Sequence, residues 1–473
     1  MERQSGTKFP ALYLWELFRK NICLTAIILS VLALSFLSTL NAGTSKSEAG
    51  FTGNTACHAL NEENICPEPA AVNLTEKSTF SAGVAKINIT PSTPVIMAGY
   101  SGRPDPFKGV HDSLFAVATV FDDGAAKAVI IAADVIGFSH DSWDKITKKI
   151  EKETGIPQKF ILLSPNHTHG GPATGRYGED PDNDLAAYNR ELNNKLVTVT
   201  KEALGRLQPA LIGSGKGICK MSINRRALNS STKGLRIGKN PYGPVDHEVG
   251  VVRIDNQEGK VFSLFVNWPT HATVMGRENY MITADWPGAT RRHIEREFNG
   301  PVIASVTAGA SGDINPLYRE RPTFSDGELE ETGIILGREV VRVANEINTY
   351  PAVSINALQR VITLPGKMPG GSWLPRDSFD PGPDIDVRLS LLRVGNIIFA
   401  GISGEVFSEI GMKIKELSPY KSTHIITHCN GASGYLITDS AYPEGGYEVF
   451  ATRVMAGAEQ GIINNFIEMI NDI

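Results

Sequence analysis

Short apolar runs that are typical of buried strands alternate along the chain with stretches of helical periodicity. Residues 128–134 and 160–164 are such apolar runs, and residues 141–153 between them show the helical pattern. The same strand–helix–strand order occurs twice more, over residues 261–268, 289–298 and 302–307, and over residues 396–401, 406–417 and 424–427. This alternation predicts an α/β protein whose mixed, mostly buried β-sheets are flanked by helices. We expect an amphipathic helix near residues 453–470.

The first 79 residues have a different character. Residues 1–21 carry four basic side chains, and residues 22–40 contain no charge. As a helix the uncharged run would span about 28 Å, enough to cross a bilayer, so it predicts a transmembrane anchor, with a signal sequence as the alternative. The basic flank would keep the N-terminus in the cytoplasm and the remainder outside, membrane-anchored or, after cleavage, secreted. Residues 41–79 read as a flexible linker, which leaves residues 80–473 as a single large domain.

Composition narrows the classes of function. Apolar residues make up 41% of the chain and charged residues 21%, which suits a large folded domain rather than a disordered protein. The formal net charge is -5 and no run of Lys and Arg is present, so nucleic acid is excluded as a partner. Cys57 and Cys66 are close enough in sequence to form a small disulfide loop, whereas Cys219 and Cys429 are explained at least as well as buried apolar residues.

Chemically competent side chains follow four of the predicted strands. They are His167 and His169, then His271, then Asp313, then Glu405. Each alone has an ordinary explanation, such as a turn cap or a carboxylate at a helix start. Ligands of α/β proteins bind beyond the carboxyl ends of strands, so the shared position favours one joint site. Two imidazoles and a carboxylate suffice to hold zinc with an open position, and the proline-rich residues 365–383 predict an irregular segment over that site.

Three motifs carry a resemblance to a known family. Residues 83–91 (GVAKINITP), 97–100 (MAGY) and 167–172 (HTHGGP) resemble, in the same order, motifs of the neutral, non-lysosomal ceramidases, in which the last motif reads HTHSGP. The resemblance implies one Zn²⁺ ion that activates water to hydrolyse the amide of ceramide, giving sphingosine and fatty acid. It also implies the zinc ligands His167, His271, Glu405 and Tyr435. Tyr435 is not marked by spacing, since its ordinary reading is a core aromatic.

The resemblance also assigns residues around the ion. His169 would contact the substrate or the developing oxyanion, Arg225 and Tyr447 would line the head-group pocket, and Asp313 is a candidate general base or orienting residue. One departure is at residues 312–317, where GDINPL replaces the family's GDVSPN, so Asn315 stands in place of a serine sometimes assigned as the nucleophile. An amide cannot form an acyl-enzyme, which favours attack by water while Asn315 donates a hydrogen bond.

Two alternatives stay open from the sequence. A metal-dependent amidase could act on another N-acylated lipid, peptide or amino sugar, and a ceramidase-like protein could bind such a molecule without turnover. Asn315 is the residue that favours the second alternative. The family's C-terminal immunoglobulin-like domain has no expected counterpart here.

Overall fold

The core of the protein is an eight-stranded mixed sheet with the strand order β12-β10-β9-β6-β1-β3-β4-β5. The pairs β4–β5 and β10–β12 are parallel, and the remaining neighbours are antiparallel. Its strands are β1 (Ser81–Asn88), β3 (Phe115–Asp122), β4 (Lys127–Ala133), β5 (Ile161–Pro165), β6 (Gln208–Ile218), β9 (Glu248–Asn256), β10 (Val261–Trp268) and β12 (Ile303–Ala308).

A second, four-stranded sheet has the order β14-β15-β16-β18. It consists of β14 (Ile355–Lys367), β15 (Pro381–Val394), β16 (Ile397–Ile402) and β18 (Ser422–Ile426). Three small sheets pair β2 (Gly109–Val110) with β11 (Met281–Ile282), β7 (Ser222–Leu228) with β8 (Leu235–Asn240) and β13 (Ile314–Pro316), and β17 (Glu405–Val406) with β19 (Tyr435–Leu436).

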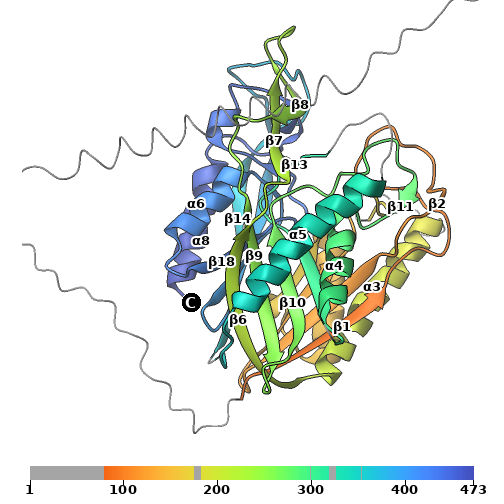
Figure 1. Ribbon diagram of the computed structural model, residues 1–473. Helices are drawn as coiled ribbons and strands as arrows, with labels where there is room; N and C mark the ends of the chain where they lie inside the picture. Colours follow the sequence, from red (N-terminus) through yellow and green to blue (C-terminus); the bar gives the residue numbers. More distant parts are fainter. Residues whose placement is uncertain (1–78, 175–182, 299, 319–325, 353) are drawn as a thin grey trace, which may run out of the picture. The chain divides into compact units, whose positions relative to one another are not determined.

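Figure 1 shows the computed structural model, which describes residues 79–174, 183–298, 300–318, 326–352 and 354–473. All of them belong to one unit, Leu74–Ile473. The predicted segments 1–21 and 22–40, Cys57 and Cys66, and the predicted linker up to residue 78 lie outside the described residues. Among the helices described, none has the length and hydropathy needed to span a bilayer.

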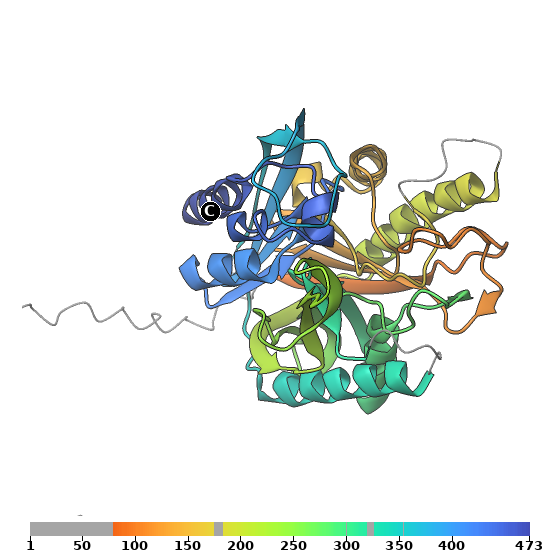
Figure 2. The ribbon, with the colours of Figure 1, turned by 90° about the horizontal axis from the view of Figure 1, so that it is seen from above.

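Helices cover the outer faces of both sheets. They are α2 (His140–Thr154), α3 (Asp184–Gly205), α4 (Trp286–Glu297), α5 (Asp326–Glu346), α6 (Ser408–Leu417) and α8 (Ala458–Asn471). The short helix α7 (Tyr447–Ala451) contacts β8 instead, and η1 (Gln158–Phe160) and η2 (Asp439–Ala441) are 3-10 turns. Helix α3 packs on β1 and β3 beside α2, whereas α4 and α5 pack together on β12, β6 and β9. Figure 2 shows α5 (teal) and the C-terminal α8 (dark blue) on the outside of the strands.

The two large sheets face each other across a shared apolar layer. Strand residues alternate between faces, so Leu392 of β15 packs toward the eight-stranded sheet with Phe265 and Phe399, while its neighbour Leu391 packs with α6 and α8. The result is four layers, with helices outside and two sheets inside. This arrangement explains why most strands are apolar on both faces, and it confirms the predicted mixed α/β class.

The three predicted strand–helix–strand units are present, because each joins a parallel pair: β4–α2–β5, β10–α4–β12 and β16–α6–β18. The irregular segment predicted at 365–383 is shorter than expected, because β14 and β15 form a hairpin whose pairing reaches Lys367↔Pro381. Pro381 is tolerated there because this end of β15 extends beyond its pairing with β16, so one side of the strand needs no donor. Cys219 and Cys429 are buried free thiols.

Candidate metal centre

A cavity of about 1030 Å³ lies at the edge where the strands end. Six of the nine residues predicted for the site line it: His167, His169, Arg225, Glu405, Tyr435 and Tyr447. His271 is 1% exposed and lies directly behind this wall, with its ring centroid 5.1 Å from that of His167. The structure therefore brings together all four residues expected as ligands, from stretches that are far apart in sequence.

His167 is held in a left-handed turn that follows β5. Its φ is 61°, and its backbone N–H donates to Val135 O at 3.1 Å. Asn166 anchors the turn by donating to Asp134, which also forms a buried ion pair with Arg291. Thr168 forms an isolated β-bridge with Ala272, and His169 comes directly after it. His169 lines the same cavity as His167, and the two ring centroids are 5.0 Å apart.

His271 is positioned by a second turn and by the segment that follows it. Its Nδ1 atom donates to Ser311 O at 2.7 Å, in the turn after β12, and its carbonyl accepts from Trp286 Nε1 at 3.0 Å. The segment between His271 and α4 is fastened by Asp285, which accepts from the backbone N–H groups of Val274 and Met275.

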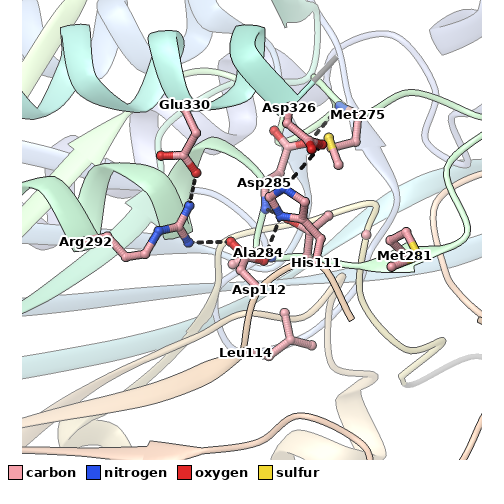
Figure 3. A network of polar contacts seen from close by, with 12 residues as sticks. His111, Asp112, Leu114, Met275, Met281, Ala284, Asp285, Arg292, Asp326 and Glu330 are labelled. Carbon is pink, nitrogen blue, oxygen red and sulfur yellow. Dashed lines mark hydrogen bonds and ion pairs between the residues drawn. The ribbon is translucent and has the colours of Figure 1, made fainter. Parts of the chain in front are cut away.

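A network next to this segment, drawn in Figure 3, ties it to two helices. Asp112 accepts from the backbone of Ala284 at 2.9 Å and from Arg292 of α4, and Arg292 also pairs with Glu330 of α5. The backbone that carries His271 is therefore fixed by charged contacts outside the cavity.

The register of the smallest sheet places Glu405 beside Tyr435. Strands β17 and β19 are parallel, and Glu405 lies directly opposite Tyr435. Opposite residues in neighbouring strands project from the same face, so the carboxylate and the phenol both reach the cavity. Tyr435 was expected only from the family resemblance, and this register supplies its physical basis.

The hydrogen bonds of the two imidazoles fix which nitrogen faces Glu405. Nδ1 of His167 lies 2.7 Å from Ile136 O, and Nδ1 of His271 lies 2.7 Å from Ser311 O. Because a carbonyl oxygen can only accept, both Nδ1 atoms are donors, and the Nε2 atom of each neutral ring presents a lone pair. Both Nε2 atoms face Oε2 of Glu405, at 3.8 Å from His167 and 3.4 Å from His271. These separations are too long for good hydrogen bonds, but about 3.4 Å is expected between two ligand atoms on one tetrahedral zinc ion.

Burial and neighbouring charges set the protonation of these groups. Burial lowers the pKa of His167, and burial together with the charge of Arg225 lowers the pKa of His271 to about 4. Burial acts to raise the pKa of Glu405, but the surrounding imidazoles hold it well below its usual value. At neutral pH the cluster thus combines neutral nitrogen ligands with an anionic oxygen, which fits a zinc ion.

Arg225 already places a positive charge against two of the expected ligands. Its Nη1 lies 3.1 Å from Nε2 of His271, and its Nη2 donates to the Tyr435 hydroxyl at 2.9 Å. Its Nε donates to Glu448 at 2.7 Å, and Glu448 also accepts from Arg226 at 2.9 Å. A metal ion held by His271 and Tyr435 would share these two residues with the guanidinium. Glu448 was not predicted as a site residue, although it is the one carboxylate among the apolar and aromatic residues of α7, and this pattern could have indicated it.

His428 is a second residue that the sequence reading missed. It lies two residues after the end of β18, is 6% exposed, and its ring stacks on that of His167 with centroids 3.7 Å apart. One possible metal cluster of the described residues consists of His167, Glu405 and His428, and another of His167, His169 and His271. The rule that found the other site residues, a polar side chain just after a predicted strand, applies to His428 as well.

Asp313 and Asn315 lie elsewhere. The Asp313 carboxylate accepts from Ser408 N at 2.8 Å and from Asn224 at 2.9 Å, and it borders a different cavity. This position does not suit a general base; the turn around Asp313 instead orients His271 through the Ser311 carbonyl. Asn315 is buried in β13 and does not line the main cavity, so a direct hydrogen bond from it to a substrate there is not supported.

The segment 368–380, between β14 and β15, contributes to the cavity as anticipated. Trp373 lines the cavity and packs on Tyr447, with ring centroids 5.5 Å apart. Tyr447 in turn lies 5.7 Å from Tyr435, so aromatic rings connect the centre of the site to its rim.

Comparison with known proteins gives a consistent result. Residues 80–323 match the family described as neutral/alkaline non-lysosomal ceramidase, N-terminal. Neutral ceramidase A of Dictyostelium discoideum is 25% identical over 275 residues, which are 54% of this chain and 38% of that protein. Neutral ceramidase of Pseudomonas aeruginosa is 23% identical over 266 residues, 54% of this chain and 40% of that one. The chain thus matches about two fifths of the length of these relatives.

Solved structures extend the likeness in fold over more of the chain. The crystal structure of neutral ceramidase from Pseudomonas aeruginosa has a TM-score of 0.69 at 17% identity, covering 84% of this chain and 74% of that chain. A structure titled "Ceramidase complexed with C2" has a TM-score of 0.71 at 16% identity, covering 83% and 75%. Glu405 and Tyr435 lie beyond the residues of the family match, so their place in the site rests on the geometry above.

Proposed function

Because the chain belongs to the neutral/alkaline non-lysosomal ceramidase family, we propose that it is a metal-dependent hydrolase that cleaves the amide bond of an N-acylated lipid. The proposed reaction adds one water across the carbon–nitrogen bond of ceramide and releases a fatty acid and sphingosine. We place one zinc ion between His167, His271, Glu405 and Tyr435. The observation that supports this most is the convergence of two imidazole lone pairs on the Glu405 carboxylate at 3.4 and 3.8 Å.

A zinc ion held there supplies a Lewis acid and allows water to react at neutral pH. The side chains around it perform the other tasks. Arg225, which is buried and charged, stabilises negative charge that develops on the amide oxygen. His169, on the cavity wall beside His167, transfers a proton from water to the departing amine. With Asn315 in place of a serine, no acyl-enzyme is part of the proposal.

The cavity wall supports an amphiphilic substrate. Its lining combines charged and imidazole groups with the apolar side chains of Ile96, Met275, Ile237 and Trp373. An acyl chain therefore has apolar surface to contact while its amide contacts the polar groups. The predicted anchor at residues 22–40 would keep such an enzyme beside a bilayer, outside the cytoplasm, and this placement is part of the proposal.

The test compares His167→Ala with His293→Ala, which removes a buried histidine on α4 that does not line the cavity. We expect His167→Ala to lose bound zinc, measured by elemental analysis, and to lower hydrolysis of an N-acyl sphingosine at least 100-fold, because the ligand set is broken. His293→Ala should retain both. Hydrolysis that survives loss of the metal contradicts the mechanism.

A panel of N-acyl sphingosines, N-acyl amino acids and N-acyl amino sugars identifies the substrate class. We expect the sphingolipid to have the highest kcat/KM. A preference for another N-acyl compound contradicts ceramide as the substrate but keeps the metal hydrolase. Full zinc occupancy without turnover of any member of the panel contradicts the enzymatic function and favours a binding protein.

A further inference from the structure

His428 sits on the side of the cluster formed by His167 and Glu405, and the ligand set implied by the family does not include it. The imidazole planes of His428 and His167 are within 11° of parallel, with ring centroids 3.7 Å apart. The ligand atoms of His428, His167 and Glu405 all lie within 4.8 Å of one another. His428 is therefore close enough to reach an ion held by the other two residues once its ring tilts out of the stack, because the lone pairs of two parallel imidazoles do not point at one ion.

The Nε2 atom of His428 is buried and has no hydrogen-bond partner among the residues that the structure describes. A buried polar atom is normally hydrogen-bonded, because leaving it unpaired costs free energy. His424, four residues earlier on β18, shows the ordinary case: it is equally buried, and its Nε2 lies 3.0 Å from the Ser214 hydroxyl. Among the described residues, Nε2 of His424 thus has a hydrogen-bond partner, whereas Nε2 of His428 has none.

The backbone holds His428 in an uncommon conformation. Its φ is 56°, in the left-handed region that residues other than glycine rarely adopt. Its N–H donates to Gly404 O at 3.0 Å, one residue before Glu405. The strained turn and the hydrogen bond together fix the imidazole beside the carboxylate, which is typical of a residue that is kept for function rather than for packing.

The geometry points to His428 as an additional ligand of the cation proposed above, so that in this chain three imidazoles, from His167, His271 and His428, surround Glu405. This inference rests on the proposed function, since it needs the same ion. Tyr435, whose hydroxyl accepts from Arg225 at 2.9 Å, stays in the ligand set of the proposed function, so His428 adds a ligand and replaces none.

The experiment uses Co²⁺ as the probe, because its visible absorption reports the number and type of ligands. His428→Phe keeps an aromatic ring against His167 but removes the ligand nitrogen. The matched control is His424→Phe, in which the new ring lies among Phe265 and Phe399. Affinity for Co²⁺ is measured on the full-length protein by competition with a chelating dye, and near-ultraviolet circular dichroism verifies that each variant is folded.

We expect His428→Phe to weaken Co²⁺ binding at least tenfold and to shift the visible bands, while His424→Phe leaves both unchanged. X-ray absorption of the wild-type Co²⁺ protein should give three imidazoles per ion, a measurement that needs no variant. Two imidazoles per ion, or unchanged affinity and spectrum in folded His428→Phe, overturns the inference while the proposed function stands. A wild-type protein that binds no Co²⁺ overturns both.

Discussion

Glu448 allows a quantitative test of how the centre is held in place. This carboxylate is 2% exposed and accepts from Arg225 at 2.7 Å and from Arg226 at 2.9 Å. Arg226 also pairs with Glu444 at 3.0 Å, but the Glu444 side chain is 56% exposed. The two glutamates therefore contact the same guanidinium from a buried and from a solvent-exposed position.

Replacing Glu448 by Gln removes the charge and leaves Arg225 buried without its carboxylate. Breaking one side of a buried ion pair costs about 3–5 kcal/mol, and the amide oxygen of Gln can still accept one hydrogen bond. We therefore expect a loss near the lower limit, about 3 kcal/mol of the free energy of unfolding. Glu444→Gln should cost less than about 1 kcal/mol, because exposed pairs are weak.

Urea titration followed by tryptophan fluorescence measures both variants in the same detergent-containing buffer. Because Arg225 also contacts His271 and Tyr435, Glu448→Gln should in addition raise KM for an N-acyl substrate, whereas Glu444→Gln should not. If Glu448→Gln costs no more than Glu444→Gln, the idea that a buried carboxylate positions Arg225 is refuted.

Two further outcomes follow from the site and its surroundings. Trp373→Ala removes an apolar wall of the cavity. In parallel steady-state assays it should raise KM about tenfold for long-chain N-acyl substrates, with little change for short-chain ones. Equal effects on both would contradict the placement of the acyl chain against Trp373. Burial raises the pKa of Asp313 from 3.8 to about 6, so the folded protein binds this proton more tightly than the unfolded chain, and Asp313 makes stability fall as pH rises from about 4 to about 6. Asp313→Asn should flatten that part of the stability–pH curve in unfolding experiments, and an unchanged slope would contradict the assignment.

Local periodicity was sufficient to predict the three strand–helix–strand units. A buried strand and an amphipathic helix are marked by spacings of two and of 3.6 residues, which depend on neighbours in sequence. The rule that ligands gather beyond strand ends then placed His167, His271 and Glu405 at one edge, and the cavity lies there. The same rule applies to His428, which comes directly after the predicted run 424–427 and was overlooked.

Contacts between distant segments were beyond the reach of the sequence. Arg225 and Glu448 are 223 positions apart, and their ion pair exists because β7 and α7 approach the cavity from different parts of the chain. Asp313 follows a strand like the other candidates, yet its side chain turns toward the start of α6 and accepts from Ser408. No local pattern in the sequence shows that Glu448 contacts Arg225 at the cavity while Asp313 turns away from it, since both side chains are acidic and both are buried.

The sequence by itself determined which residues end the strands and hence the chemistry available at one edge of the sheets. Only the tertiary structure decided which of those side chains share a cavity, because sheet register sets the direction of a side chain. Glu405 lies opposite Tyr435 in β17 and β19, so the carboxylate and the phenol point the same way. Register depends on hydrogen bonds between strands that are separate in sequence. Alternative registers differ in how side chains pack over the whole layer, so no local stretch of residues determines their relative free energy.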